Sequence, residues 1–513
     1  MLPSHPPAAG RRAVAAPPWR AAAALALALG LHGAALASPA SDIAELKKAL
    51  AAMKANYEQR ITALETQLQA TQDALAQARA AGPAAAAPAT ATAAASAPDT
   101  TLAASPAAVA PAAPPPDALA AVAPPPPVDT SAAAPTGAAT AGANAFNPQI
   151  SLILSGQYAH TSQDPASARI TGFALPPGAE TGVGSRGFSL SESELALAAN
   201  IDPWLAGNIN LSISGDNSIE AEEAYITTTS LPDGLVLKAG RFFSGIGYLN
   251  SQHSHTWDFV DNPLAYQAML GTQYGDDGLQ LHWLAPTDQF LEFGLEAGRG
   301  RSFPGDDGSR NAAGMAAFTF HTGGDIGDSH SWRAGLSWLQ ADADGQALSD
   351  VARDGGPVDT TFSGRTRVWI ADGVWKWAPH GNATRTYFKL QGEWLQSRRS
   401  GDLAVGEGIA APYRAIQSGG YVQGVWQFLP LWRVGLRTER LDPGHANYGL
   451  NADVLAGTDY HPTKNSLMVD FNPSEFSRFR LQLAQDRSRQ GAIDHQVLLQ
   501  YQTSLGAHGA HSY

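Results

Sequence analysis

The stretch RFRLQLAQD, residues 478–486, alternates polar and apolar side chains. Successive residues of a β-strand point to opposite faces, so Arg478 and Arg480 are expected to share one face. Phe479 and Leu481 then share the other face. A soluble sandwich would bury the apolar face and expose the arginines, whereas a membrane barrel would turn the arginines into a water-filled lumen. The rest of the chain distinguishes these two folds.

The bulk composition excludes several classes of protein. The chain has 513 residues, no cysteine, 15% charged residues and a formal net charge of -13. Without cysteine there are no disulfides, thiolate metal sites or cysteine nucleophiles. The negative charge argues against a nucleic-acid partner. No GxSxG, HExxH or phosphate-binding glycine loop stands out, so we do not expect an enzyme.

Residues 1–37 have the features of a signal peptide. Arg11, Arg12 and Arg20 precede a long apolar run, and Ala35-Leu36-Ala37 has the small-x-small form of a cleavage site. No later stretch approaches the roughly 20 apolar residues that a membrane-spanning helix needs. Insertion into a membrane would therefore require strands, which favours the outer membrane with the N-terminal region in the periplasm.

Residues 38–81 are expected to form a periplasmic coiled coil. Residues 41–80 contain no Gly or Pro, and their apolar positions follow steps of three and four, with one extra step of four between Tyr57 and Ile61. A single amphipathic helix lying on another surface is the alternative. Residues 82–144 are almost entirely Ala, Pro, Thr and Ser, a composition that predicts a disordered linker before the barrel at 145–513.

Residues 145–513 contain about sixteen alternating segments separated by Gly, Asn and Asp turns. In YFKLQGEWL, for example, Lys389, Gln391 and Glu393 alternate with apolar residues. Apolar and aromatic residues also alternate from Val497 towards Tyr513, and an aromatic last residue is common in strands that the barrel-insertion machinery recognises. A soluble sandwich rarely needs so many consecutive strands. The predicted fold class is an all-β transmembrane barrel of about 16 antiparallel strands.

The two halves of this barrel differ in charge. Residues 145–350 hold 24 acidic and 8 basic residues, whereas 351–513 hold 14 acidic and 17 basic. An acidic wall is therefore expected opposite a basic wall, with the following pore-lining residues: Glu292, Glu296, Arg333, Lys389, Glu393, Arg433, Arg437, Arg478 and Arg480. These charges could select solutes, or they could pair with one another and only stabilise the wall. Two arrangements stay open: a row of basic residues that favours anions, and a constriction of mixed charge with weak selectivity.

The segment NSQHSHTWDF is expected on a long loop and offers metal ligands. His253, His255 and Asp258 could supply nitrogen and oxygen donors to zinc. The HxH spacing is a weak motif, and ordinary polar loop histidines are the alternative. We predict no other cofactor.

Six stretches carry a resemblance to a known family: GFSLSESELALAANID, LKAGRFFSGIGYLNSQHSHTWDFVDNPLAYQ, LQLHWLAPTDQFLEFG, SHSWRAGLSWL, NPSEFSRFRLQ and the final SLGAHGAHSY. With them the chain resembles proteobacterial outer-membrane proteins often labelled zinc-regulated TonB-dependent outer-membrane receptors, and more distantly the phosphate-selective porin O/P group. The helix and linker resemble those of coiled-coil-bearing trimeric porins. The resemblance implies an outer-membrane barrel and a zinc-related context. The chain departs from TonB-dependent transporters because no folded plug domain precedes the barrel.

These observations predict an outer-membrane porin that lets small polar or charged solutes diffuse passively through its lumen. The alternative is an outer-membrane receptor or uptake protein for zinc or a zinc complex, without a TonB-type plug domain. An outer-membrane hydrolase and an adhesive anchor with a plugged barrel are further alternatives. The expected partners are outer-membrane lipid, two further copies in a homotrimer held through the barrel and the coiled coil, and the barrel-insertion machinery at the C-terminal strand.

Overall fold

The computed structural model describes residues 148–506, except 217 and 309–310. The predicted signal peptide, coiled coil and linker lie outside the described residues, as do residues 507–513 at the end of the chain. Among the described residues, none of the helices combines the length and the apolar composition needed to cross a membrane.

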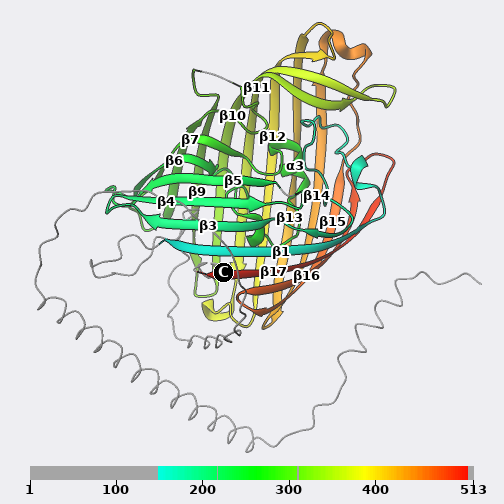
Figure 1. The fold of residues 1–513 in the computed structure, drawn as a ribbon. Helices are drawn as coiled ribbons and strands as arrows, with labels where there is room; N and C mark the ends of the chain where they lie inside the picture. Colours follow the sequence, from blue (N-terminus) through cyan, green and yellow to red (C-terminus); the bar gives the residue numbers. More distant parts are fainter. Residues whose placement is uncertain (1–147, 217, 309–310, 507–513) are drawn as a thin grey trace, which may run out of the picture. The chain divides into compact units, whose positions relative to one another are not determined.

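The described chain is built almost entirely of strands (Figure 1). The first strands are β1 Gln149–Thr161, β2 Gly187–Leu190, β3 Ser193–Asn200, β4 Leu205–Ile213, β5 Ile219–Thr228, β6 Leu235–Phe243, β7 Gly275–Leu284, β8 Phe290–Gly298 and β9 Met315–Ile326. The remaining strands are β10 His330–Val351, β11 Pro357–Trp377, β12 Tyr387–Val405, β13 Ala411–Leu429, β14 Trp432–Asn447, β15 Thr463–Ser474, β16 Ser477–Arg487 and β17 Asp494–Gly506. The helical segments are η1 Pro165–Ser167, η2 Ser254–Thr256, α3 Leu264–Leu270, η3 Pro379–Gly381 and η4 Gly449–Asp453.

The strands form one closed antiparallel sheet. Apart from the short β2, each strand pairs with the next along the chain, and the pairing of β1 with β17 closes the ring. β2 and β3 lie end to end along β1, opposite residues 156–159 and 149–153 respectively. They therefore occupy a single strand position, and the barrel has sixteen positions. The prediction of about sixteen antiparallel strands is confirmed.

The two faces of the barrel differ as the alternation predicts. On β16, Arg480, Gln482 and Asp486 are buried inside the barrel, whereas Leu481 and Leu483 are exposed on its outer surface. The same pattern continues on its neighbours β15 and β17. Large apolar side chains are thus exposed on the outside while charged side chains are buried within. This is the reverse of a soluble globular protein and the arrangement of a barrel in lipid.

Aromatic side chains form a row on the outer surface near one end of the barrel. On β14 to β17 the rings of Trp432, Phe471, Phe479 and Tyr501 follow one another, with centroid separations of 4.7, 6.5 and 4.6 Å. The row resumes on β7 to β9 with Trp283, Phe293 and Phe320. These residues lie next to the short turns, and such a girdle is typical of the membrane–water interface.

Long connections leave the opposite end of the barrel, and one of them folds inside it. We call residues 244–274, between β6 and β7, the inner loop. It contains α3, all of whose residues are buried and which packs against β12, β13 and β14. The apolar core of the protein consequently lies within the barrel, where inner-loop residues such as Ile246 and Leu249 pack with residues of the wall such as Ile370 and Leu395.

Candidate functional site

The inner loop and the wall that it contacts form the candidate functional site. All nine predicted pore-lining residues lie on inward-facing positions of β8, β10, β12, β14 and β16. Most of them contact the inner loop or the carboxylates that hold it. Their function as pore-lining residues stays a prediction, but their positions show which of them can meet water.

Glu393 of β12 anchors the inner loop. Its carboxylate accepts hydrogen bonds from the backbone N–H groups of Tyr248 and Leu249 at 2.9 and 3.1 Å. It also accepts from the hydroxyls of Tyr266 on α3 and Tyr421 on β13, at 2.8 and 2.7 Å. Four donors around one buried carboxylate satisfy its lone pairs, so this side chain joins the loop, α3 and the wall at a single point.

A glycine lets the loop backbone approach this carboxylate. Gly247 has φ +67°, in the left-handed region that favours glycine. A Cβ at this position would lie 2.7 Å from the hydroxyl oxygen of Tyr266 and closer still to the carboxylate of Glu393. Only a residue without a side chain fits between the loop and its anchor.

Two loop aspartates contact the basic wall. Asp258 lies 2.5 Å from the ammonium nitrogen of Lys389 and 3.4 Å from a guanidinium nitrogen of Arg433. Arg433 also pairs with Asp470 on β15, which pairs in turn with Arg480 at 2.8 Å. The resulting chain of alternating charges crosses β12, β14, β15 and β16, and it compensates most of the positive charge that the sequence places on this side.

Asp261 makes the second set of contacts. Its carboxylate accepts from Arg437 at 2.7 Å, from Lys464 at 2.5 Å and from Gln482 at 2.7 Å. Glu439 of β14 completes this region by accepting the backbone N–H of Leu264, the first residue of α3, at 2.6 Å. The start of the helix is therefore held by a wall carboxylate, and the residues before it are held by wall cations.

The basic wall lowers the pKa of both loop aspartates. Burial raises the pKa of Asp258, but Lys389 and Arg433 outweigh it and bring the pKa below its usual range. Burial likewise raises the pKa of Asp261, and Lys464 and Arg437 lower it further than burial raises it. A folded-state pKa below the unfolded one stabilises the fold above the unfolded pKa, and this contribution is lost as pH falls through the folded pKa. Both anchors therefore persist at neutral and mildly acidic pH.

Arg478, from the stretch that first indicated the fold, contacts the loop backbone. Its guanidinium donates to the carbonyl of His255 at 2.7 Å and to the side-chain oxygen of Gln502 at 2.6 Å. Arg480 donates to the carbonyl of Trp257 at 2.9 Å. These arginines point into the barrel as predicted, where they hold the inner loop.

The acidic wall binds the loop through backbone donors. Glu296 of β8 accepts the N–H of Gly245 at 2.8 Å and the side-chain amide of Gln280 at 2.7 Å. Glu292 lies 3.0 Å from His321 of β9. The inner loop therefore connects the two walls: Asp258 and Asp261 meet cations of the basic wall, and the N–H of Gly245 meets Glu296 of the acidic wall.

Buried polar atoms without a protein partner gather on the wall from β7 to β11. Arg333 of β10 stacks its guanidinium 5.3 Å from the ring centroid of Tyr248, yet its Nε and one terminal nitrogen have no hydrogen-bond partner among the described residues. Other side chains of this wall with at least one such atom include Gln280, Glu296, Thr319, His321 and Asp372. Buried polar groups that lack a protein partner are normally satisfied by water.

The predicted metal ligands are only partly brought together. His253 and His255 stack with ring centroids 5.7 Å apart, close to carboxylates of β3 and β5. Asp258 lies elsewhere, with Lys389 and Arg433. Cations compete for this carboxylate, so the three residues do not form the predicted set. Metal binding itself stays untested by this geometry.

Sequence reasoning missed the carboxylates that surround the histidines. They are Glu192, Glu194, Glu222 and Glu223, which contact His253, Ser254 and His255. Two consecutive glutamates within the strand EAEEAYI break the alternation, and that break was the available signal.

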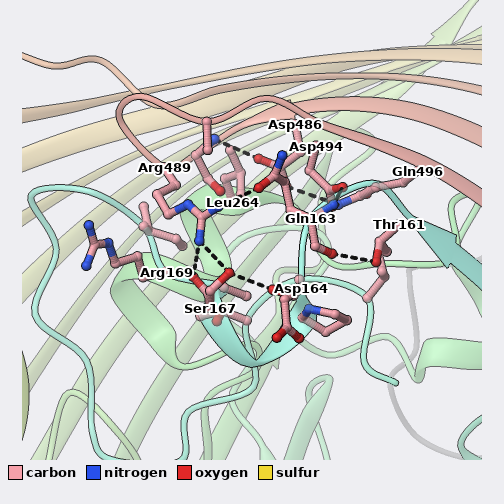
Figure 2. A pocket seen from close by; sticks show the side chains of 18 of the residues that line it. Thr161, Gln163, Asp164, Ser167, Arg169, Leu264, Asp486, Arg489, Asp494 and Gln496 are labelled. Atoms are coloured by element: carbon pink, nitrogen blue, oxygen red, sulfur yellow. Dashed lines mark hydrogen bonds between the residues drawn. The ribbon is translucent and has the colours of Figure 1, made fainter. Parts of the chain in front are cut away.

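Loops also cover the barrel at its long-loop end. The β1–β2 loop places Ile170, Phe173 and Leu175 in the interior core. Figure 2 shows the small pocket beneath it, where Arg489 of the β16–β17 loop donates to Gln163 at 2.9 Å and to the carbonyl of Ser167 at 3.0 Å. These contacts join two neighbouring loops at the long-loop end of the barrel.

The comparisons with known proteins found a relative in sequence and several similar structures. No family model matches it. An uncharacterized protein of Aquifex aeolicus (strain VF5) is 31% identical over 395 residues, which cover 72% of this chain and 80% of the relative. The chain belongs to the same family as this protein. The resemblance to zinc-regulated receptors therefore stays a prediction.

Solved structures similar to the chain are outer-membrane proteins. A loop-deletion form of OmpT of Vibrio cholerae has a TM-score of 0.44 and 10% identity, covering 70% of this chain and 99% of that one. The outer-membrane channel DcaP of Acinetobacter baumannii has a TM-score of 0.41 and 11% identity, covering 70% and 97%. An anion-selective porin of Comamonas acidovorans has a TM-score of 0.41 and 12% identity, covering 70% and 99%.

Proposed function

We propose that the chain is an outer-membrane porin in which small polar or charged solutes diffuse passively through a lumen narrowed by the inner loop. The observation that carries the proposal is the closed sixteen-position barrel with apolar side chains outside and charged side chains inside. Lipid covers such an outer surface at no cost, and only water or a polar solute suits such an interior. Passive diffusion requires no catalytic group.

We place the aqueous path beside Arg333 of β10, towards the short-turn end of the wall from β7 to β11. On the opposite side the loop is bonded to Lys389, Arg433, Arg437 and Arg480 directly or through Asp470, so those charges have protein partners. The β7–β11 wall carries many of the side chains with a polar atom that lacks a protein partner among the described residues. Of the predicted basic residues, Arg333 is the one on this wall.

Planar-bilayer recording of the purified full-length protein tests the function. We expect small, discrete conductance steps, because the inner loop occupies part of the lumen. A folded, membrane-inserted protein that gives no conductance at any voltage would support the plugged anchor instead. Turnover of lipid or ester substrates would indicate the hydrolase.

The charge of Arg333 is expected to influence ion selectivity. Arg333→Glu reverses one charge on the proposed path and should raise the cation-to-anion permeability ratio several-fold, measured as the reversal potential in a salt gradient. The matched control is Arg365→Glu on β11, whose side chain is 46% exposed and pairs with Asp342 at 2.9 Å. Equal shifts in both variants would contradict a path along this wall.

The outward orientation of Leu481 gives a test of membrane insertion. Leu481→Arg places a charge near the middle of β16 on the lipid side and should destabilise the inserted barrel by about 2–4 kcal/mol. Asn465→Arg, on the outward face of β15 nearer the long-loop end, should cost no more than about 1 kcal/mol. Denaturant unfolding from lipid vesicles measures both, and equal small effects would argue against a membrane position.

Trimer formation and the roles of the N-terminal segments are also proposals. Deleting residues 41–80 should reduce the trimer population if the predicted coiled coil holds three copies together. Cross-linking in native membranes checks this, and an unchanged trimer would leave association to the barrel.

A further inference from the structure

A cluster of carboxylates surrounds two histidines where the inner loop meets the wall of β3, β4 and β5. Nδ1 of His253 lies 3.3 Å from Glu222 and 3.4 Å from Glu194, and its Nε2 lies 3.0 Å from Glu223. Nδ1 of His255 lies 2.8 Å from the second oxygen of Glu194. We call these five residues the His253 cluster. Four chain segments distant in sequence supply it and its neighbours, so the fold assembles it.

Two irregularities of the sheet converge on this cluster. The register of β4 with β5 shifts between Asn210 and Leu211, so that Glu222 is an extra residue and two consecutive glutamates turn to the interior. The strand position of β2 and β3 is interrupted at residues 191–192, and Glu192 bonds there to the hydroxyl of Ser254. Regular strands would have turned alternate residues outward. Bulges of this kind often re-aim side chains at functional sites.

The geometry within the cluster suits a cation. Ligand atoms of Glu194, Glu222 and His253 all lie within 4.8 Å of one another. Glu194 and Glu223 are 4% and 5% exposed, so their charges are held in a region with little solvent. The two imidazoles of the cluster cannot balance its three carboxylates, so negative charge remains that is costly to bury, and a divalent cation at the shared position compensates it.

Asn210 of β4 gives an independent indication of a ligand. This side chain is 5% exposed, and its amide nitrogen lies 3.2 Å from Glu223 and 3.0 Å from Nε2 of His253. Its carbonyl oxygen is buried and has no hydrogen-bond partner among the described residues. Buried polar atoms normally have a hydrogen-bond partner, so this carbonyl oxygen, which lacks one beside the cluster, points to a bound species.

We propose that Glu194, Glu222 and His253 bind a divalent first-row transition-metal cation, of which Zn²⁺ is the test case. One imidazole with two carboxylates is a donor set that such cations accept, and three protein ligands leave a position for water or a further donor. Mg²⁺ and Ca²⁺ prefer sites made of oxygen alone and should bind more weakly. The bound cation would join the inner loop to β3 and β5. The site does not depend on conduction.

Metal titration of the full-length protein, purified in detergent and stripped with a chelator, tests this site. Isothermal calorimetry with Zn²⁺, Mn²⁺ and Mg²⁺ should show one Zn²⁺ per chain and weaker Mg²⁺ binding. Glu194→Gln, Glu222→Gln and His253→Ala should each weaken Zn²⁺ binding by at least about tenfold, since each removes a direct ligand. The matched control is His380→Asn, because His380 pairs with a single carboxylate, Asp328, at 3.2 Å in an exposed turn.

Two further measurements keep the test decisive. The barrel fold of each variant is checked by its heat-dependent gel mobility, and Glu194→Gln keeps the shape of the side chain it replaces. The wild-type Zn²⁺ complex is examined by X-ray absorption, which should show a shell of nitrogen and oxygen with imidazole scattering. Zn²⁺ binding that survives all three cluster variants would overturn the proposal. Zn²⁺ binding that is lost only when the two histidines near the end of the sequence are replaced, in the double variant His508→Ala, His511→Ala, would also overturn it. So would a folded wild-type protein that binds no Zn²⁺.

Discussion

Glu393→Ala is expected to release the inner loop and to raise the single-channel conductance several-fold. The substitution leaves two backbone N–H groups and the hydroxyls of Tyr266 and Tyr421 without their acceptor. Each buried donor left unsatisfied costs about 1–3 kcal/mol, so docking of the loop should lose at least about 3 kcal/mol. A loss of that size raises the population of the open loop by about a hundredfold.

Release of the loop can be measured without background, because the chain contains no cysteine. Ala268 on α3 is 3% exposed, so the cysteine of Ala268→Cys should react slowly with a maleimide. In the double variant Ala268→Cys, Glu393→Ala the same cysteine should react rapidly. Gly247→Ala should act in the same direction, since its added Cβ would contact the anchor. Glu407→Ala, in the exposed turn between β12 and β13, is the matched control. Unchanged conductance and labelling in Glu393→Ala would mean that other contacts hold the loop.

Asp261→Ala is expected to cause the largest loss of stability among single substitutions in the loop. It leaves Arg437 and Lys464, which are 3% and 0% exposed, without their shared carboxylate. Arg437 keeps Glu439 at 2.8 Å and Lys464 keeps Asp486 at 3.5 Å. Removing one partner of a buried ion pair typically costs about 3–5 kcal/mol, and these remaining partners place the expected loss near the lower end, about 3 kcal/mol. The free energy of unfolding, measured by denaturant titration from lipid vesicles, should fall by that amount.

The control for this prediction is an ion pair that is more exposed to solvent. Arg241 and Asp277 are 2.7 Å apart, and their side chains are 31% and 36% exposed. Asp277→Ala should cost no more than about 1 kcal/mol, because water solvates the arginine that it leaves behind. If Asp261→Ala cost as little as Asp277→Ala, the basic wall around the loop would have to be hydrated.

The wall of the barrel could be predicted from local alternation alone. The side-chain period of a strand is two, so Leu481 and Arg480 are assigned to opposite faces without knowledge of any partner. The count of strands followed from the same pattern. Exceptions include the interruption at residues 191–192 and the extra residue at Glu222, where irregular pairing alters the alternation.

The candidate site was predicted less completely. The sequence identified His253 and His255 and the charged inward positions, but it assigned Asp258 to the histidines. Which carboxylate meets which cation depends on contacts between distant segments, such as the bond between Tyr248 and Glu393, 145 residues apart. Alternation contains no information about such pairs, because it describes a side chain's face and not its partner.

Strand periodicity and the apolar runs of a helical span are local properties, so the amino-acid sequence is enough to predict a barrel with a charged interior and an apolar exterior. The position of residues 244–274 inside the barrel, and their bonds to interior charges such as Glu393, Lys389 and Arg437, emerge only in the folded chain. A buried charge requires a partner or water, and contacts between distant segments determine which of the two it meets.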